Sequence, residues 1–584
     1  VPPDFPELRH ALDHVHALAK QRDEQIAGEQ RQRLLDLARQ DHFRDYANAL
    51  LARMESFDPV TIDSMIGQIQ GGLPFVGVES RGPDTLARFY PDFVAAVHLR
   101  QEPAGKLVEA ELQGRGLVNL SPLNRGPDQE RRALDLMRYW SSFAAAMKSG
   151  NADQLRNHLV NLLGTLGFAR SRLENSAQLI RNRLHRFTLN ATLQMGREQF
   201  LPPIYGSESR GQYNVLIADD AVRDRELATH LGSMGRDKPS FLIVLGRLDR
   251  RRRESLAHEL RLERQTVVLL DESLIVFMAL GEDEPLETLF ACGLPFGYLQ
   301  PYTTKPRTIP PEMFFGRKEE IQSIVARQSG GCLVYGGRQL GKSALLNHVK
   351  QQFDKPDGAQ RVINIDIKPI GGRGVPADRI WHDLAYELHD AGIFDLKDYT
   401  AESFRSEVRN WLKAKPGRQL LVMLDEADNF LAAEARHGNY ANLLVLKDLM
   451  ERTNWDFKVV FAGLHNVRRM SRAANSPLPH LGTPICIGPL DSNPDNLAEA
   501  RRLVTAPMRA AGYDYTDPNL AYSILARVNY YPSLVQVFCQ TVIENAGKTP
   551  RVSGSGPSWK LGRAELFEGA IWRTINDEIQ TRFR

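Results

Sequence analysis

The sequence predicts a multidomain protein: an N-terminal all-α region, a small α/β domain, a second α/β domain with a glycine-rich loop, and a C-terminal helical region. Three patterns support this prediction. Up to about residue 164, apolar residues recur three and four positions apart, the spacing of helices with one buried face. From about residue 213 to 280, short apolar runs alternate with amphipathic stretches, as in parallel sheets with crossover helices. From residue 332, an apolar run, a glycine-rich turn and an amphipathic stretch follow one another directly.

Length and composition indicate a soluble, globular protein with several cores. A chain of 584 residues is too long for one compact core, so three or four domains are expected. Hydrophobic residues make up 42% and charged residues 25%, which is the balance of a folded rather than a disordered chain. The formal net charge of +3 does not by itself indicate nucleic acid or an anionic membrane as a partner.

The cysteines and the absence of long apolar runs favour a cytoplasmic protein that does not contact the membrane. The 4 cysteines form no CxxC pair, so neither a disulfide framework nor a zinc site is expected. No apolar run reaches the roughly 18 residues of a membrane helix, and the first residues lack the apolar centre of a signal peptide. The sequence begins at Val1 without a methionine and ends at Arg584 inside an expected helix, which leaves open a longer polypeptide.

These patterns divide the sequence into five expected regions. They are residues 1–165, an all-α helical region; 166–300, a receiver-like or degenerate α/β domain; 301–313, a proline-rich linker; 314–490, a P-loop core; and 491–584, a helical lid with the start of a winged-helix region. The likeness of the second region to receiver-like domains is one of topology, because no phosphoacceptor constellation can be assigned there.

Three features of the second region have alternative interpretations. The run RLDRRRRESLAHELRLER, from Arg247, is either a phosphate-contacting helix or, as we favour, a charge-rich helix with a solvated face. The segment VVLLDES, with Asp271 and Glu272, resembles the acidic strand of a nucleotide site, but a strand followed by a capped helix is favoured. A metal-dependent nuclease site would start from Glu208, Asp219 and Asp220, but no ExK pattern follows.

The strongest functional motif is GGRQLGKS, which matches the GxxxxGK[ST] pattern between an apolar strand and a helix. Gly336, Gly337 and Gly341 let the backbone approach a phosphate group and direct several N–H groups at it. Lys342 can reach the β and γ phosphates, and the Ser343 hydroxyl suits one coordination position on Mg²⁺. ATP with Mg²⁺ is therefore the expected ligand. The expected contacts in this loop are Gly336, Gly337, Arg338, Gln339, Leu340, Gly341, Lys342, Ser343 and Ala344.

A second motif, RQLLVMLDEADNF, supplies the acids that such a site needs. Its strand is apolar on both faces, as in a central parallel strand, and it delivers Asp425 and Glu426 at its carboxyl end, where open α/β sheets bind ligands. We expect Asp425 to hold the magnesium ion and Glu426 to orient and polarise the attacking water. Asp428 and Asn429 are expected to cap a helix or to support the site from behind.

Three further strands complete the expected sheet. RVINIDI lies between the two motifs, and FKVVFAGLHN follows them, with PICIGPL near Cys486 as the fifth strand. This order suits the P-loop class that carries an extra strand between the loop strand and the acidic strand. His465 or Asn466, at the end of the fourth strand, is a candidate for sensing the γ-phosphate, with loop capping as an equally open role.

At this point the motifs resemble a family, the AAA+ and STAND ATPases, in the branch of archaeal-type and replication-initiator-like modules found in bacterial defence proteins. The likeness spans about residues 314–547 and includes FFGRKEEI, GGRQLGKS, LVMLDEAD, VFAGLHN, IGPL and the lid pattern RVNYYPSLVQVFCQ. It implies that the segment before the loop contacts the adenine and that Pro532 is the lid proline. The residues implied at the base are Phe314, Phe315, Gly316 and Arg317. Arg468, Arg469 and Arg472 are candidates for an arginine finger acting on a neighbouring subunit, with surface charge as the alternative.

The resemblance leaves three functional hypotheses. The first is an ATPase switch that forms a homo-oligomer and controls an effector protein, with antiviral (phage) defence as one setting. The second is a DNA-acting ATPase of the initiator or transposition-regulator type, whose binding to duplex DNA would depend steeply on salt. The third is a nucleotide-gated scaffold with negligible hydrolysis.

Overall fold

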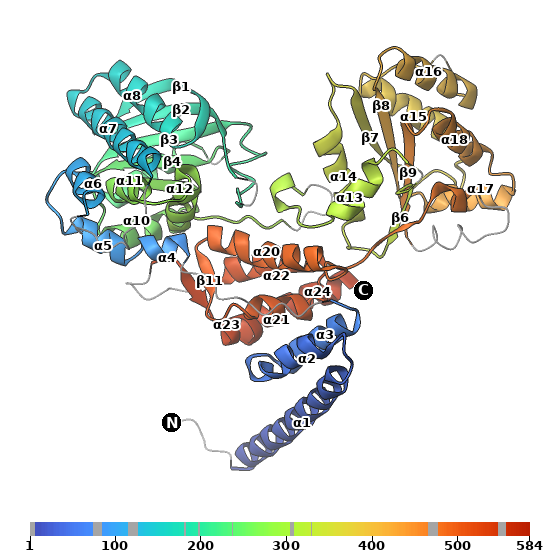
Figure 1. The fold of residues 1–584 in the computed structure, drawn as a ribbon, viewed down its shortest axis with the longest axis horizontal. Helices are drawn as coiled ribbons and strands as arrows, with labels where there is room; N and C mark the ends of the chain where they lie inside the picture. Colours follow the sequence, from blue (N-terminus) through green and yellow to red (C-terminus); the bar gives the residue numbers. More distant parts are fainter. Residues whose placement is uncertain are drawn as a thin grey trace. The chain divides into compact units, whose positions relative to one another are not determined.

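The computed structural model describes residues 6–73, 84–114, 126–179, 183–196, 199–235, 237–303, 309–328, 330–396, 398–464, 477–546 and 556–583. These residues form two compact units, and most of their helices and strands are labelled in Figure 1. Unit 1 comprises Val1–Tyr302, Arg501–Arg527 and Gln536–Arg584, and unit 2 comprises Thr303–Ala500 and Val528–Val535. The expected C-terminal region, residues 491–584, is therefore divided between the two units.

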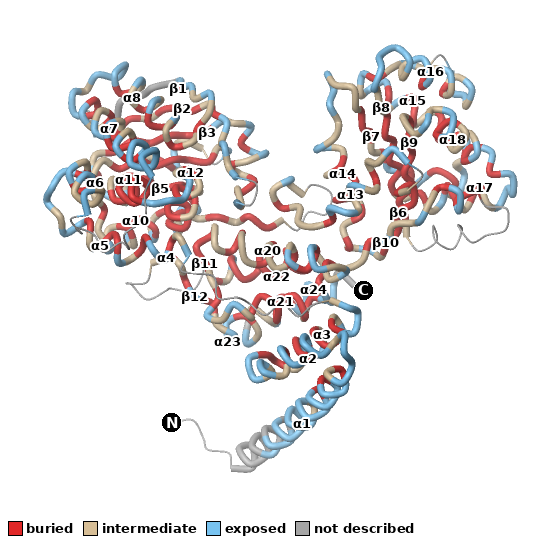
Figure 2. The backbone as a smooth tube through the Cα atoms, in the orientation of Figure 1, coloured by how far each residue is buried: buried red, intermediate tan, exposed pale blue. Residues whose placement is uncertain are grey.

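Unit 1 begins with the expected helical region. Its elements are α1 (Pro6–Ala38), α2 (Arg44–Leu51), η1 (Met54–Ser56), α3 (Pro59–Gln70), α4 (Thr85–Phe89), α5 (Asp92–His98), α6 (Ala104–Leu112), α7 (Pro127–Ser149) and α8 (Ala152–Thr165). The C-terminal end of α1 packs on α2 and α3, and Leu34 and Leu37 are buried there. Most described residues nearer the N-terminus of α1 are exposed (Figure 2).

A mixed five-stranded sheet follows in unit 1, in the order β1-β2-β3-β4-β5. Its strands are β1 (Phe168–Leu179), β2 (Leu184–Leu193), β3 (Gln212–Asp219), β4 (Ser240–Leu245) and β5 (Val267–Asp271). The three apolar runs expected as parallel strands are β3, β4 and β5, and they do pair in parallel. Strands β1 and β2 were not predicted, and they extend the sheet by antiparallel pairing. This sequential order differs from the 2-1-3-4-5 order of receiver-like folds, so the likeness is limited to the β3–β5 part.

Helices of unit 1 cover this sheet, and a C-terminal group of elements completes the unit. The covering helices are α9 (Asp224–Gly232), α10 (Arg250–Leu262), α11 (Glu272–Leu280), α12 (Pro285–Gly293) and η2 (Leu294–Phe296). The C-terminal elements are α20 (Pro494–Ala510), β11 (Tyr513–Tyr515), α21 (Leu520–Arg527), α22 (Pro532–Ala546), β12 (Trp559–Leu561), α23 (Arg563–Phe567) and α24 (Gly569–Phe583). Helices α20 and α22 begin in unit 2 and continue in unit 1.

A buried carboxylate joins the N-terminal helices to this C-terminal group. Asp58, which caps α3, accepts hydrogen bonds from Thr61 and from Ser523 Oγ at 3.0 Å, and it forms ion pairs with Arg527 and Arg563. Burial opposes ionisation of Asp58, but the hydrogen bonds from Thr61 and Arg527 outweigh it and hold its pKa well below the usual range.

Unit 2 contains a fully parallel sheet in the order β10-β6-β9-β8-β7. Its elements are η3 (Pro311–Met313), α13 (Lys318–Val325), β6 (Leu333–Gly336), α14 (Lys342–Phe353), β7 (Gln360–Asp366), α15 (Arg379–Asp390), α16 (Ala401–Lys413), β8 (Gln419–Asp425), α17 (Asp428–His437), α18 (Ala441–Arg452), β9 (Phe457–Gly463), η4 (Leu478–Leu481) and β10 (Ile485–Ile487). The five strands expected from the sequence are thus present: β9 lies between the loop strand β6 and the acidic strand β8, and β7 lies beyond β8 at the edge of the sheet.

Two apolar clusters cover the two faces of this sheet, so its central strands β6, β8 and β9 are buried almost throughout (Figure 2). One cluster joins side chains of α15, α16, α17 and α18 to one face, and the other joins α13 and α14 to the opposite face. Burial on both faces explains why the β8 run LLVML contains no polar residue.

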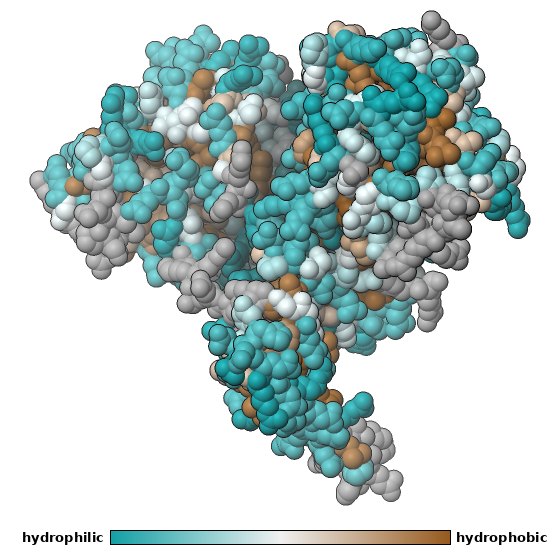
Figure 3. Space-filling model, turned by 45° about the vertical axis from the view of Figure 1, so that its right-hand side comes forward, coloured by the Kyte–Doolittle hydropathy of each residue, from teal (hydrophilic) through white to brown (hydrophobic). Residues whose placement is uncertain are grey.

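Hydrophilic side chains cover most of the face drawn in Figure 3, and hydrophobic residues come to the surface there in small groups. Among the described residues, no helix combines the length and the apolar character that crossing a membrane would require.

Candidate functional site

The candidate site lies at the edge of the unit 2 sheet where its parallel strands end. β6 ends at Gly336, β8 ends at Asp425, and β9, which pairs with both, ends at Gly463. Because parallel strands end at a common edge, the glycine-rich loop and the acidic motif meet there. The sequence predicts this meeting from strand order alone, and the register of β6, β9 and β8 agrees with it.

Loop 336–343, the stretch from Gly336 to Ser343, depends on glycine at two positions for different reasons. A Cβ on Gly336 would overlap the carbonyl oxygen of Ile487 in the neighbouring strand β10. Gly341 has φ +89°, a left-handed conformation that L-residues adopt at a cost, but a Cβ there would meet no atom within 4 Å. Gln339 also lies in the left-handed region, with φ 63°. The loop conformation therefore requires a glycine at Gly336 for space and favours a glycine at Gly341 for its positive φ.

Lys342, the first residue of α14, is buried at the inner side of this loop with 8% of its surface exposed. Its ammonium group donates hydrogen bonds to the carbonyls of Gly336 at 2.9 Å and Gly337 at 3.0 Å. Burial lowers the pKa of this ammonium, whereas the negative charges of Asp425 and Glu426 act in the opposite direction. The loop lysine and the acidic motif thus interact electrostatically across the end of the sheet.

Asp425 and Glu426 differ in their surroundings. Asp425 is buried, at 7% exposure, and its Oδ1 accepts the backbone N–H of Glu426 at 2.9 Å. Its carbonyl accepts from the N–H of Ile367, which follows β7, at 2.9 Å. Glu426 is partly exposed and has φ 56°, an uncommon conformation for a residue that is not glycine. This turn leaves Asp425 fixed within the sheet and Glu426 at the surface of the site.

The next two polar residues, expected to cap a helix or to support the site, hold the neighbouring loops in place. Asp428 Oδ2 accepts the N–H of Leu464, the residue after β9, at 2.8 Å. Asn429 Nδ2 donates to the carbonyl of Lys368, after β7, at 2.8 Å. Both side chains therefore connect the start of α17 to the ends of adjacent strands.

The segment expected to contact a base packs against α14 and α20. The Phe314 ring stacks on the His348 imidazole, with ring centroids 4.0 Å apart and planes inclined by 10°. Burial lowers the pKa of His348. Gly316 has φ +79°, and Asn496 Oδ1 accepts the N–H of Arg317 at 2.7 Å.

The Arg317 side chain is engaged inside the protein. Its guanidinium donates to Glu320 at 3.0 Å and to the carbonyl of Gly488, which follows β10. Only 4% of the Arg317 side chain is exposed. The charge of Arg317 is therefore already paired inside the protein. Its side chain stabilises the position of this segment by binding Glu320 and the residue after β10.

The segment around Pro532 lies beside loop 336–343. Tyr530 accepts the N–H of Leu490 at 3.0 Å, and Tyr531 packs on the apolar cluster that also contains Leu340. Ser533 Oγ donates to the carbonyl of Gln339 at 3.0 Å. Pro532 is the first residue of α22 and is partly buried.

Several of these contacts were not predicted. Ser533 bonds Gln339, and Asn496 bonds Arg317, although each pair is far apart in the sequence. Nothing in the sequence indicated that the His348 ring stacks on Phe314. The sequence signal that could have indicated a role for Ser533 is its position directly after the lid proline, Pro532. His465, Asn466, Arg468, Arg469 and Arg472 lie outside the described residues.

The donor set fits a nucleotide with magnesium. The space that a Cβ on Gly341 would fill is open, which allows a phosphate group to approach the backbone there, and Lys342 provides a cation in the same loop. Ser343 follows Lys342 as the second residue of α14, and Asp425 provides a buried carboxylate. Magnesium is commonly held by one or two such oxygen ligands together with waters and phosphate oxygens. Ser343 and Asp425 would hold the ion.

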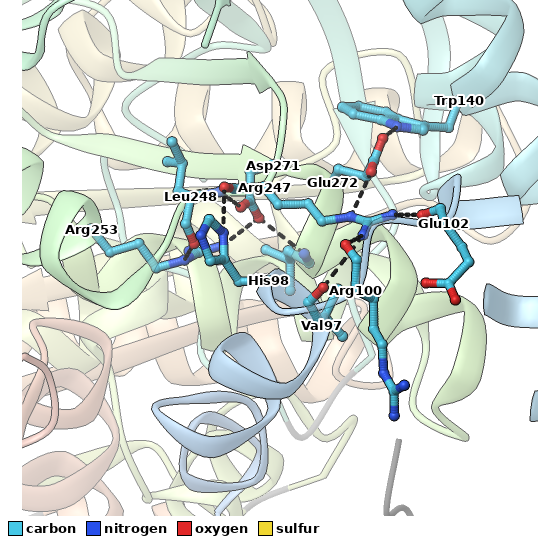
Figure 4. A network of polar contacts seen from close by, with 11 residues as sticks. Val97, His98, Arg100, Glu102, Trp140, Arg247, Leu248, Arg253, Asp271 and Glu272 are labelled. Atoms are coloured by element: carbon cyan, nitrogen blue, oxygen red, sulfur yellow. Dashed lines mark hydrogen bonds and ion pairs between the residues drawn. The ribbon is translucent and has the colours of Figure 1, made fainter. Parts of the chain in front are cut away.

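Part of the basic run in unit 1 forms an internal network (Figure 4), whereas Arg250, Arg251 and Arg264 are exposed, so the helix also has the solvated face that the sequence favours. Arg247 bonds Glu272 at 2.8 Å, and its guanidinium donates to the carbonyls of Val97, Arg100 and Glu102. Trp140 Nε1 donates to the other oxygen of Glu272 at 3.1 Å. These contacts fix the helical region onto the ends of β4 and β5.

Asp271, the end of β5, has the favoured role of a helix cap and also forms a buried ion pair. It accepts the N–H groups of Leu274 at 3.0 Å and Leu248 at 2.9 Å, and it pairs with Arg253. Both side chains are fully buried, and the Arg253 guanidinium lies over the rings of Phe89 and Phe296. Asp271 is therefore fully engaged in supporting the fold.

The acids of the nuclease alternative do not form a recognised metal cluster. Asp219 accepts the N–H of Ala221 at 2.8 Å, and burial together with the adjacent Asp219 raises the pKa of Asp220. Within the described ranges, no group of three or more His, Cys, Asp or Glu side chains is placed to hold a metal ion.

Comparison with known families identifies one match. The AAA domain family matches residues 326–470, a range that includes loop 336–343 and the acidic end of β8. The chain therefore contains an AAA-type P-loop domain, and this family indicates a nucleotide-binding ATPase that typically uses Mg²⁺. A comparison with curated proteins finds no match.

Proposed function

We propose that this protein binds and hydrolyses ATP at the end of the unit 2 sheet and uses the nucleotide state to switch its assembly with other proteins. The observation that carries the proposal is the buried Lys342 ammonium, bonded to the Gly336 and Gly337 carbonyls at the edge of the sheet where β8 ends in the buried Asp425. A cation within a glycine loop, facing a buried acid and a partly exposed one, is the arrangement that phosphoryl transfer requires.

Each side chain has a separate task in this proposal. The loop amides and Lys342 bind the β and γ phosphates, and Ser343 and Asp425 hold magnesium. The ion, when bound, neutralises charge on the phosphate oxygens. Glu426, at the surface of the site, orients the attacking water and accepts its proton. His465 and Asn466 are proposed as sensors of the γ-phosphate.

The base is proposed to lie near residues 314–317 and Pro532. The stacking of Phe314 on His348 and the packing of Tyr531 on the same apolar cluster as Leu340 support this placement. Phe315 and the backbone of Gly316 are proposed contacts, whereas Arg317 supports the segment through Glu320 and Gly488.

The biological role is proposed to be that of a STAND-like regulatory switch. Nucleotide exchange would drive homo-oligomerisation and control of an effector protein in the cytoplasm, and antiviral defence is one setting for such proteins. The AAA domain supports this role, since AAA proteins often oligomerise. The DNA-acting alternative would need a basic surface, and several arginines of the run after Arg247 are instead bonded within unit 1.

The proposal is tested by measuring ATP and ADP affinity and hydrolysis with the full chain. Lys342→Ala removes charge-assisted hydrogen bonds to phosphate and should weaken binding roughly 10- to 100-fold. The control is Lys350→Ala on the same helix, which should bind nucleotide as the unchanged protein does. If neither nucleotide binds the unchanged protein, or if Lys342→Ala binds normally, the proposed site is wrong.

A further inference from the structure

The hydroxyl of Ser533 connects the start of α22 to loop 336–343. Ser533 Oγ donates to the Gln339 carbonyl at 3.0 Å, across a sequence separation of 194 residues. Gln339 has φ 63°, so its peptide carbonyl is held in an orientation that a right-handed turn would not produce. A bond to this carbonyl therefore stabilises an uncommon conformation of the loop.

The peptide geometry extends this effect to the next residue. In a trans peptide the carbonyl of Gln339 and the N–H of Leu340 point in opposite directions. When Ser533 fixes the carbonyl, it also fixes the direction of the Leu340 N–H. That N–H belongs to the group of loop amides proposed to receive phosphate oxygens.

Two further contacts keep Ser533 in place. Leu490, after β10, donates its N–H to the Tyr530 carbonyl at 3.0 Å. Tyr531 packs on the apolar cluster in which Leu340 is buried. The segment 528–535 belongs to unit 2 with the loop, so the bond from Ser533 rests on a supported backbone.

We propose that Ser533 is a positioning residue for nucleotide binding, because its hydroxyl holds the Gln339–Leu340 peptide in the orientation that binds phosphate. Ser533 acts through the loop and does not touch the nucleotide. This inference rests on the proposed function and assigns to it a residue outside the motifs that predict the site.

The test compares Ser533→Ala with Ser533→Thr, which keeps the hydroxyl, and with Gln540→Ala, a change farther along α22. Loss of one neutral hydrogen bond should weaken the affinity for both ADP and ATP about 2- to 10-fold in Ser533→Ala. KM for ATP should rise by a similar factor while kcat changes little, because the same binding is lost from ground and transition states. Ser533→Thr should restore the affinity, and Gln540→Ala should not change it.

Hydrogen exchange of the loop amides gives a readout that does not depend on nucleotide. Peptides covering residues 336–345 should exchange faster in Ser533→Ala than in the unchanged protein and in Ser533→Thr. The inference about Ser533 would be overturned, with the proposed function left intact, by either of two results. The first is normal nucleotide binding and normal amide exchange in Ser533→Ala. The second is an equal loss of nucleotide affinity in Ser533→Ala and Ser533→Thr. If the unchanged protein binds neither ADP nor ATP, the proposed function and the inference both fail.

Discussion

At the scale of single residues, the site is defined by which charges are already paired and which face the ligand. Arg317 is paired with Glu320 and bonded to Gly488, so it stabilises the segment around it. Lys342 donates to two loop carbonyls, and a phosphate group must compete with them for the ammonium. Glu426 is partly exposed, which suits a group that exchanges a proton with water.

Replacing Glu426 with glutamine should separate hydrolysis from binding. The amide keeps the size of the side chain but cannot accept a proton from water, so ATP turnover should fall about 100-fold or more while ATP affinity stays within a few-fold. Phosphate release under single-turnover conditions, with ATP binding measured in parallel, checks this. Glu451→Gln on α18, a surface change, is the matched control. Unchanged turnover in Glu426→Gln would assign water activation to another group.

The buried pair of Arg253 and Asp271 should be far more sensitive to loss of one member than an exposed pair. Asp271→Asn leaves the Arg253 guanidinium buried without its counter-charge, at a cost of about 3–5 kcal/mol. Thermal unfolding should show a clear decrease in Tm. The exposed pair of Arg88 and Asp283 provides the control, because Asp283→Asn should cost at most about 1 kcal/mol.

A double variant sharpens this test. Arg253→Met together with Asp271→Asn removes both charges, so it should be more stable than Asp271→Asn alone. Equal Tm values for the single and double variants would mean that lost packing, rather than the unpaired charge, dominates the effect.

At the scale of elements, the loop between β6 and α14 is shaped by two constraints of different origin. Gly336 lies where β10 approaches β6, so its constraint is one of space. Gly341 precedes α14 in a left-handed conformation, and its constraint is one of backbone geometry. The two glycines of one motif should therefore respond differently to substitution.

Alanine and asparagine at these two glycines should distinguish the constraints. At Gly341, alanine costs about 1–2 kcal/mol through its positive φ, and asparagine should cost less because it tolerates this conformation better. At Gly336, asparagine should be at least as harmful as alanine, because either side chain overlaps the Ile487 carbonyl. Thermal unfolding of the four variants measures the order. If alanine and asparagine rank in the same order of stability at Gly336 and Gly341, the two glycines are not subject to different constraints.

At the scale of the whole molecule, the sequence predicted the parallel sheet of unit 2 and the AAA-type site more completely than it predicted unit 1. The motifs of β6 and β8 combine a buried run with residues that only a phosphate site needs. β2 alternates buried and less buried residues, but its sequence LHRFTLNATL is rich in polar side chains, so its period-two pattern was not recognised. Arg253 looked like surface charge because its partners, Asp271 and the two rings, come from other parts of the chain.

Assembly should depend on the nucleotide if the protein is a switch. With ATP and magnesium, Glu426→Gln should form larger assemblies than Lys342→Ala, because the first variant hydrolyses bound ATP slowly whereas the second is expected to bind ATP more weakly. Mass photometry of the full chain measures this. Adding duplex DNA at increasing salt tests the alternative, because DNA-driven assembly should weaken steeply with salt, whereas assembly by ATP alone should occur without DNA.

The path of the chain has a consequence for how this protein can be recombined with others. Residues 528–535 fold with unit 2, while the stretches on either side of them, Arg501–Arg527 and Gln536–Arg584, fold with unit 1. A gene fragment ending at Ala500 would encode Lys342, Asp425 and Glu426 but would omit Tyr531 and Ser533. The ATPase domain is thus no interchangeable cassette: grafting it onto another protein would require two separate splices, one of them supplying only eight residues.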